Sequence, residues 1–225
     1  MNEVFPKLYA IVDRATLDAR GLKVREFARE LREAGVGLVQ YRDKVNGPQE
    51  ILRAADEIDE AFEGAVVTRI MNDRVDLAVL AGWDGVHVGQ GDLGVEVARR
   101  VLQGHNLIEH RPSRSGVAGS SLVGVSTHNE EQARVAVDAG PNYVAVGPVF
   151  ATASKANPEP VVGLELARRA RAMTKLPIVA IGGITLANAR SVMEAGADSV
   201  AVIGGLFVEG RRVGEVARDF LEILG

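Results

Sequence analysis

Residues 177–205 read PIVAIGGITLANARSVMEAGADSVAVIGG, and this stretch decides the fold. Apolar, β-branched runs at 177–181 and 199–203 each end in a glycine pair, Gly182-Gly183 and Gly204-Gly205. Between them lies an amphipathic segment, residues 186–195, that ends at Gly196. The short apolar runs predict buried strands, and the segment predicts a helix with a left-handed glycine at its C-terminus. Strand, helix and strand in this order predict a βαβ unit with parallel strands.

The same alternation extends to both ends of the chain, with a period of about 28 residues. We expect eight strands, at residues 8–12, 37–41, 66–71, 85–89, 122–126, 143–147, 177–181 and 199–203. We expect helices at residues 24–34, 48–62, 74–81, 95–102, 130–139, 164–173, 186–195 and 214–223. Two of these helices, like residues 186–195, end at a glycine suited to a left-handed cap, Gly35 and Gly140.

Eight such units in 225 residues predict a (β/α)8 TIM barrel of the α/β class, forming a single domain over residues 1–225. A doubly wound open sheet is the alternative. It is less favoured because Ile11-Val12-Asp13-Arg14, after the first strand, lacks the Gly-x-Gly-x-x-Gly pattern. Residues 104–120, rich in glycine, serine and charge, interrupt the rhythm and predict a mobile insertion on the face away from the chemistry.

Composition excludes several classes of function. Lys and Arg number 26 against 30 Asp and Glu, a net charge of −4 that argues against nucleic-acid or membrane-surface partners. The absence of cysteine excludes a disulfide framework, a thiolate nucleophile and a Cys-ligated metal. No apolar run approaches the roughly 18 residues of a membrane helix, and no signal peptide is supported. We therefore expect a cytoplasmic protein, which could form a homo-oligomer.

The predicted strand at 37–41 ends in Gln40-Tyr41-Arg42-Asp43-Lys44. The period of two sends Gln40, Arg42 and Lys44 to one side. If that side is the barrel mouth, the two cations need a counter-charge that an anionic ligand could supply. A pair of solvated charges at a strand end is an equally good interpretation of these residues alone.

Two carboxylates, Asp73 and Asp92, follow the next two predicted strands. Mg²⁺ takes one or two protein carboxylates and completes its shell with water and phosphate oxygens. The pair therefore predicts a magnesium site for a diphosphate beside the cations. Both aspartates could instead cap the helices that follow them.

The remaining strand ends predict a phosphate site. Thr152, Ser154 and Lys155 follow the sixth strand, and the glycine pairs after the seventh and eighth strands let backbone N–H groups approach a ligand. Ser126 and His128 end the fifth strand, but without a Gly-x-Ser-x-Gly elbow they do not predict a hydrolase triad. We interpret Ser126 as a hydrogen-bond donor and His128 as a helix-start residue. His87 could contact a polar heterocycle or lie satisfied inside the barrel.

Together these strand ends resemble the thiamine-phosphate synthase family over essentially the whole chain, from Leu8 to Leu224. The residues that carry the resemblance are Gln40-x-Arg42-x-Lys44, Asn72-Asp73-Arg74, His87-x-Gly89-Gln90-x-Asp92, Gly124-Val125-Ser126-x-His128, Gly147-Pro148-x-Phe150-x-Thr152-x-Ser154-Lys155 and Ile181-Gly182-Gly183-Ile184.

The resemblance implies two phosphorylated small-molecule substrates, a hydroxymethylpyrimidine diphosphate and a thiazole phosphate, which are joined with release of pyrophosphate. It implies that the pyrimidine diphosphate binds to Gln40, Tyr41, Arg42, Asp43, Lys44, Asn72, Ser126 and Lys155. Of these, Arg42, Lys44, Ser126 and Lys155 are the expected catalytic residues. It implies that Asp73 and Asp92 hold Mg²⁺ and that the thiazole phosphate binds to Thr152, Ala153, Ser154, Gly183, Ile203 and Gly204.

The implied reaction also explains why no acid–base pair stands out in the sequence. In the family the pyrimidine methylene loses pyrophosphate first, and the thiazole nitrogen then attacks with its own lone pair. Two alternatives remain: a related thiazole tautomerase, and a non-catalytic protein that binds thiamine precursors. Arg42, Lys44 and the two aspartates argue against the tautomerase, because it does no diphosphate chemistry.

Overall fold

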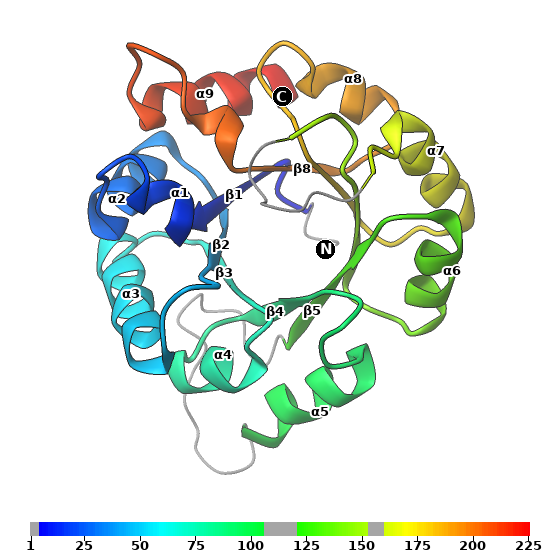
Figure 1. Cartoon of the computed structure of the whole chain (residues 1–225), viewed down its shortest axis with the longest axis horizontal. Coiled ribbons are helices and arrows are strands. Elements are labelled where there is room, and N and C mark those ends of the chain that lie inside the picture. The colour runs from blue at the N-terminus through cyan, green and yellow to red at the C-terminus, as the bar shows by residue number, and fades with distance from the viewer. Residues whose placement is uncertain (1–4, 106–120, 153–159) are drawn as a thin grey trace.

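The computed structural model describes residues 5–105, 121–152 and 160–225. Its strands pair in parallel in the order of the sequence, and the sheet closes because the last strand pairs with the first, Leu8 opposite Val200 (Figure 1). The strands are β1 (Leu8–Asp13), β2 (Leu38–Arg42), β3 (Thr68–Asn72), β4 (Gly85–Val88), β5 (Leu122–Thr127), β6 (Tyr143–Val146), β7 (Ile178–Ile181) and β8 (Ser199–Val202). The predicted barrel is confirmed, and the open sheet is wrong.

The helices surround the barrel (Figure 1). They are α1 (Arg14–Asp18), α2 (Val24–Ala34), α3 (Pro48–Ala61), α4 (Val75–Ala81), α5 (Val95–His105), α6 (Glu130–Asp138), α7 (Gly163–Met173), α8 (Ala189–Glu194) and α9 (Val213–Leu224). A short 3-10 helix, η1 (Gly204–Leu206), follows β8. Of the predicted insertion at 104–120, residues 106–120 lie outside the described residues.

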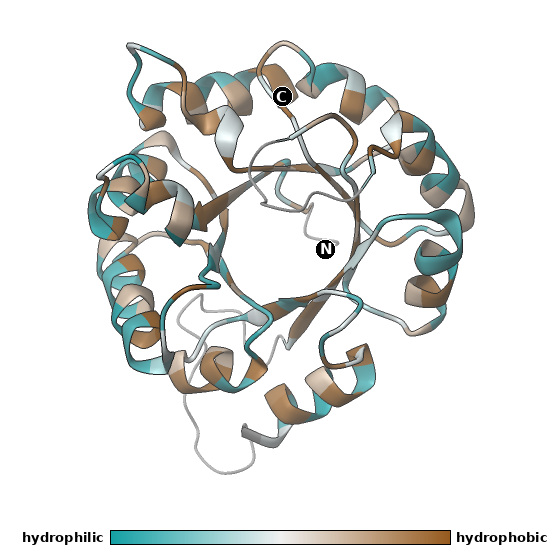
Figure 2. Cartoon of the chain, in the orientation of Figure 1, coloured by the Kyte–Doolittle hydropathy of each residue, from teal (hydrophilic) through white to brown (hydrophobic). Residues whose placement is uncertain are grey.

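Alternate residues of most strands enter two separate hydrophobic cores. Tyr9, Ile11, Leu38, Ile70 and Tyr143 belong to a cluster inside the barrel. Their neighbours along the strands pack in a larger cluster between the sheet and the helices. Figure 2 shows hydrophobic strands, and helices that carry both hydrophobic and hydrophilic residues. Because both faces of the sheet are covered, the strands are almost continuously apolar in sequence.

The helix ends confirm the glycine signals. Gly35 ends α2 at φ 86°, and Gly140 and Gly196 follow α6 and α8 at φ 66° and 99°. These values lie in the left-handed region that glycine adopts without a steric penalty. No described helix is long and apolar enough to cross a membrane.

Two short stretches differ from the prediction. Helix α1 was not predicted; it begins where the Asp13 carboxylate accepts the backbone N–H of Thr16 at 2.9 Å. Helix α8 begins at Ala189 rather than at residue 186. There the Asn188 side chain accepts the N–H of Thr185 at 2.8 Å and donates to the carbonyl of Gly183, so it holds a turn in place of the first helical turn.

Candidate active site

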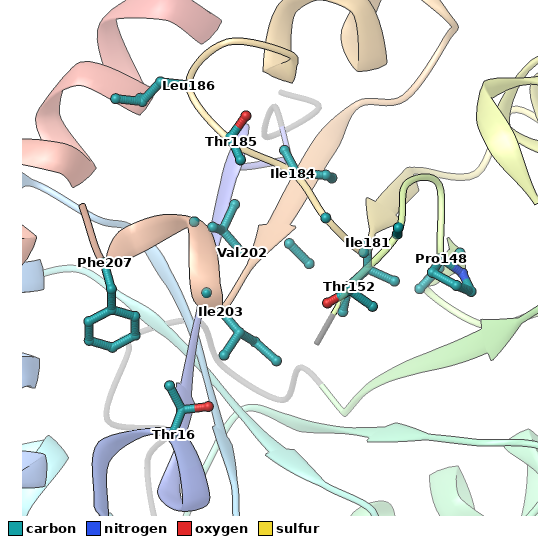
Figure 3. Close-up of a pocket in the computed structure, with 18 of the residues that line it drawn as sticks. Thr16, Pro148, Thr152, Ile181, Ile184, Thr185, Leu186, Val202, Ile203 and Phe207 are labelled. Carbon is teal, nitrogen blue, oxygen red and sulfur yellow. The ribbon is translucent and has the colours of Figure 1, made fainter. Parts of the chain in front are cut away.

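The carboxyl ends of the strands form a cavity of about 640 Å³ at one side of the barrel mouth. Ends of β5, β6, β7 and β8 contribute Ser126, Gly147, Ile181 and Ile203 to its wall. Figure 3 draws the lining side chains, with Thr16 and Phe207 on the side of β1 and β8 and with Pro148 and Thr152 on the side of β6. Ligands of such barrels bind at this face.

The alternation predicted for β2 is confirmed, because its side chains separate between the two cores. Gln40 is 3 % exposed and its carboxamide donates to the hydroxyl of Tyr9, inside the barrel. Tyr41 packs in the outer core, where its hydroxyl donates to Asp43 at 2.9 Å. The carboxylate of Asp43 also accepts the backbone N–H groups of Val45 and Asn46.

These contacts fix Asp43 in the β2–α3 loop and join it to Tyr41, on the outer face of β2. Although burial opposes it, the hydrogen bonds from Asn46 and Val45 lower the pKa of Asp43. The structure therefore does not bring the side chain of Tyr41 to the mouth with Gln40. The predicted contacts of Tyr41 and Asp43 with the pyrimidine diphosphate stay predictions.

Both cations at the end of β2, Arg42 and Lys44, have protein carboxylates as partners. Arg42 forms an ion pair at 2.6 Å with Asp13, the residue opposite it on β1. Lys44 forms an ion pair with Asp73, at the end of β3. The sequence suggested that an anionic ligand could supply the counter-charge for these cations. In the structure, protein carboxylates supply it. The side chain of Asp13 is 2 % exposed, so it fixes the guanidinium of Arg42 at the mouth.

Asp73 and Asp92 come together as predicted. Burial is the main cause that raises the pKa of Asp73; the ion pair with Lys44 opposes the rise and the neighbouring Asp92 carboxyl adds to it. Asp73 also has a φ of 58°, in a region that residues other than glycine rarely adopt. The interpretation of Asp73 as a helix cap is wrong, because α4 has Arg74 at its N-cap and no side-chain cap.

This pair has the donor chemistry of a magnesium site. Two close carboxylates, one of which is hard to ionise, match a hard cation that is held by one or two protein oxygens and otherwise by water and phosphate. Asp92 accepts the N–H of Gly89 at 2.8 Å, which holds it at the end of β4. Among the described residues no group of three or more acidic or histidine side chains surrounds a metal position, so the site would be completed by ligand and water.

The wall beside these carboxylates carries neutral polar groups. The side-chain amide nitrogen of Asn72, the last residue of β3, is buried and has no hydrogen-bond partner among the described residues. Ser126, on β5, accepts or donates a hydrogen bond of 2.8 Å with His87 on β4. An unpaired buried donor is unfavourable unless a ligand satisfies it. Asn72 and Ser126 thus remain available for the predicted pyrimidine contacts.

The predicted phosphate residues lie on the opposite side of the mouth. Thr152, Gly183, Ile203 and Gly204 all line the cavity. Ala153, Ser154 and Lys155 lie outside the described residues, so their predicted contacts stay predictions. The backbone at Gly183, with φ 63°, passes so close to the β6 loop that a Cβ there would lie 2.3 Å from the carbonyl oxygen of Ala151. Gly183 is therefore needed for a close approach of the two loops that form this wall.

Sequence reasoning missed the roles of two groups of this cavity. Arg20, from the segment between α1 and α2, lines the cavity with its guanidinium 4.3 Å from the centre of the Phe207 ring. Among the described lining residues it is the only one with a permanent charge. His128 was predicted to start a helix, but its Nδ1 donates to the carbonyl of Gly147 at 2.6 Å and its side chain lines the cavity. The long stretch between the first predicted strand and the first predicted helix is the one sequence signal that could have drawn attention to Arg20.

The fold and the site define a class of protein: a (β/α)8-barrel enzyme whose mouth carries paired carboxylates and cations on one side and glycine loops on the other. This arrangement suits a ligand with two anionic parts or two anionic ligands.

Comparison with known proteins identifies the family. The family model described as thiamine monophosphate synthase matches residues 8–206, and the chain belongs to this family. A thiamine-phosphate synthase from Koribacter versatilis is 48% identical over 221 residues, covering 97% of this chain and 96% of the relative. One from Chloroflexus aurantiacus is 39% identical over 197 residues, covering 88% and 83%. The solved structure of thiamine phosphate pyrophosphorylase from Pyrococcus furiosus superposes with a TM-score of 0.76 at 29% identity and covers 97% of this chain and 95% of that one.

Proposed function

We propose that this chain is a thiamine-phosphate synthase. It joins 4-amino-2-methyl-5-(diphosphooxymethyl)pyrimidine to a thiazole phosphate and releases pyrophosphate. Family membership supports the reaction type. In this chain, the observation that best supports the proposal is the cluster of Lys44, Asp73 and Asp92 at the mouth, across from the glycine loop at Gly183. A diphosphate leaving group and a second phosphate need two such regions.

The reaction transfers a carbon centre and needs no deprotonated nucleophile. The bond between the methylene carbon and the diphosphate oxygen breaks, and the leaving group takes the electron pair. The 4-amino group shares the positive charge that develops on the pyrimidine. The lone pair of the thiazole nitrogen then forms the new C–N bond. This balance agrees with a site whose described charged side chains are cations and carboxylates, and it leaves Ser126, which is hydrogen-bonded to His87, as a binding group rather than a nucleophile.

The chain's own residues act on the charges of this reaction. Lys44 and Arg42 are held at the mouth by Asp73 and Asp13, so they are oriented before the ligand arrives. Cations fixed where charge develops lower the barrier more than mobile ones do. Asp73 and Asp92 would hold Mg²⁺, which when bound offsets charge on the departing diphosphate. Lys155 is expected to act with them.

Arg20 and the glycine loops serve the second substrate in this proposal. Backbone N–H groups near Gly183 and Gly204 suit phosphate oxygens, and Arg20 supplies the positive charge that those neutral groups lack. A cytoplasmic location, the absence of nucleic-acid partners and a possible homo-oligomer stay predictions.

One assay tests the proposed function. Purified protein is mixed with both substrates and MgCl₂, and pyrophosphate and thiamine phosphate are measured together. We expect equal amounts of the two products. A tautomerase would form neither product, and a binding protein would retain substrates without release of pyrophosphate. Either of these results would overturn the proposal.

A further inference from the structure

Five polar side chains inside the barrel are joined end to end by hydrogen bonds. The amide nitrogen of Gln40 lies 2.8 Å from the hydroxyl of Tyr9, which lies 2.9 Å from the hydroxyl of Tyr143. The Tyr143 hydroxyl lies 3.0 Å from Nδ1 of His87, and Nε2 of His87 lies 2.8 Å from Oγ of Ser126. We call this series the interior chain. It crosses the barrel between two residues, Gln40 and Ser126, that the family resemblance assigns to the pyrimidine diphosphate.

The tyrosines and the histidine of the interior chain are shielded from water. Tyr9 and Tyr143 are 1 % and 0 % exposed, and His87 is 8 % exposed. The Phe5 ring packs against the Tyr143 ring with a centroid distance of 5.3 Å, and the His87 ring stacks on it at 5.6 Å. In these surroundings each tyrosine hydroxyl proton needs an acceptor within the interior chain, because no water competes for it.

The donors can be ordered along the chain. The amide nitrogen of Gln40 donates to Tyr9, so the Tyr9 proton must go to Tyr143, its other partner among the described residues. Tyr143 then donates to Nδ1 of His87, which leaves the imidazole proton on Nε2, where it is donated to Ser126. A neutral imidazole has one donor and one acceptor, so each bond fixes the next.

We propose that Tyr9, Tyr143 and His87 are positioning residues that set the hydrogen-bonding direction of the two groups that meet the pyrimidine. Because Ser126 accepts from His87, its own proton is turned toward the ligand. Because one N–H of Gln40 is donated to Tyr9 and holds the amide nitrogen against the barrel interior, the carboxamide oxygen is the atom turned toward the ligand, as an acceptor. The interior chain thus presents one donor and one acceptor.

This pattern matches a 4-aminopyrimidine and opposes a 4-oxopyrimidine. The amino compound offers an N–H donor next to a ring nitrogen that accepts, which complements Gln40 and Ser126. The 4-oxo compound offers an acceptor oxygen next to a ring N–H, the opposite order. This specificity rests on the proposed function, whereas the order of protons within the interior chain does not.

The hydrogen-bonding direction set by the interior chain favours the reaction as well as substrate binding. When the C–O bond of the substrate breaks, positive charge spreads to the 4-amino group and makes its N–H a stronger donor. An acceptor held at Gln40 therefore binds the transition state more tightly than the ground state. A carboxamide free to turn would present its nitrogen for part of the time.

A neighbouring glycine shows that the barrel interior is fitted around Tyr143. A Cβ at Gly124, opposite Tyr143 in the register of β5 and β6, would lie 2.0 Å from the Tyr143 ring. Any side chain there would displace the ring and with it the hydroxyl that holds His87 and Tyr9. The hydroxyl position is therefore determined by packing as well as by hydrogen bonds.

The first test needs no substrate. The chain has four histidines, so the ¹⁵N ring signals of His87 can be assigned by their loss in His87→Gln. We expect the proton of His87 on Nε2 in the wild-type protein, and a shift toward the Nδ1 form in Tyr143→Phe. A proton on Nδ1 in the wild type, the result of a Gln40 amide turned the other way, would overturn the inference.

The second test measures specificity. Dissociation constants are measured, with MgCl₂, for the 4-aminopyrimidine methyl diphosphate and for its 4-oxo counterpart. We expect the wild type to prefer the amino compound at least ~100-fold, as sites built on buried hydrogen bonds do. Tyr143→Phe should lower that ratio roughly tenfold, and Tyr9→Phe, which breaks the interior chain elsewhere, should lower it too. An unchanged ratio in both variants would contradict the proposal.

A matched control separates this effect from a general loss of packing. Ser199 carries a buried hydroxyl on β8 with no partner among the described residues, and it is not part of the interior chain. Ser199→Ala should change neither the His87 signals nor the specificity ratio. If the wild type binds neither diphosphate, the proposed function fails, while the His87 signals still decide the order of protons.

Discussion

At the scale of single residues, the mouth of the barrel gathers charges that the fold itself does not favour. Asp73 is half-buried next to a second carboxylate, and its backbone adopts a φ of 58°. Arrangements of this kind are retained at functional sites although they reduce stability. The two aspartates therefore offer a way to separate what the site does for activity from what it does for the fold.

Asp73→Asn should lower turnover at least ~100-fold, because one oxygen donor and one charge are lost beside the leaving diphosphate. Asparagine tolerates a positive φ, so the loop should keep its conformation. The measurement is pyrophosphate release at saturating substrates. Turnover within a few-fold of the wild type would remove Asp73 from the site.

The raised pKa of Asp73 also predicts how stability depends on pH. A carboxyl whose pKa is higher in the folded protein binds its proton more tightly there, so its contribution to stability is lost as the pH rises through that folded value. Without divalent cations, Asp73→Asn should therefore gain in Tm relative to the wild type as the pH is raised from about 4 to 7. MgCl₂ should reduce this difference. A constant difference across this range would show that the carboxyl is not destabilised by its surroundings.

Arg20 gives a prediction for the other substrate. Arg20→Met keeps a long side chain over Phe207 but removes the charge. The KM for the thiazole phosphate should rise roughly tenfold, the effect of one charged hydrogen bond at a partly exposed site, and the KM for the pyrimidine diphosphate should stay the same. Steady-state kinetics with each substrate varied in turn measures this. An equal rise in both KM values would place Arg20 outside the second binding region.

At the scale of elements, the loops after β6 and β7 form one wall and depend on glycine for it. Gly183→Ala should raise the KM for the thiazole phosphate and lower Tm, because the new Cβ would meet Ala151 at 2.3 Å. Gly210→Ala is the matched control: it has a similar φ, +72°, and nothing within 4 Å of the new Cβ. Both variants carry the backbone penalty of about 1–2 kcal/mol for a left-handed residue, and only Gly183→Ala adds the collision. Equal losses of stability with unchanged KM would contradict the role of this wall.

The elements themselves could be predicted because each strand is a short apolar run buried on both faces, and because glycines mark the helix ends. The partners within the site could not. The ion pair between Arg42 and Asp13 depends on the register of β1 and β2, which no local pattern sets. Tyr9 and Tyr143 are 134 residues apart and meet only because the barrel closes at a particular stagger. Motif spacing therefore located the charged residues, whereas the barrel geometry decides which of them touch.

At the scale of the whole molecule, the segment just before β1 meets the C-terminal residues on the face opposite to the site. The ammonium group of Lys7, just before β1, donates to the carbonyl oxygens of Leu224 and Gly225 at 2.8 and 2.7 Å. The strands begin on that face, whereas every proposed ligand contact lies where the strands end. The contacts that join the ends of the fold and the proposed ligand contacts thus lie at opposite ends of the barrel axis.

This separation predicts that the chain can be circularly permuted. The ends are joined by about six Gly/Ser residues, and the chain is opened between Gly64 and Ala65, in the turn before β3 where Val66 is 85 % exposed. The permutant should melt cooperatively and keep turnover within about threefold of the wild type, because no strand pair and no residue of the mouth is interrupted.

A second permutant with the same linker, opened between Gly183 and Ile184, is the control. It keeps every strand but frees the loop that forms the phosphate wall, so it should fold and lose turnover with the thiazole phosphate. Thermal melting and pyrophosphate release are measured on both proteins. If opening the chain at Gly64 abolished turnover while the protein still melted cooperatively, the site would depend on the opposite face of the barrel, and the separation would be wrong.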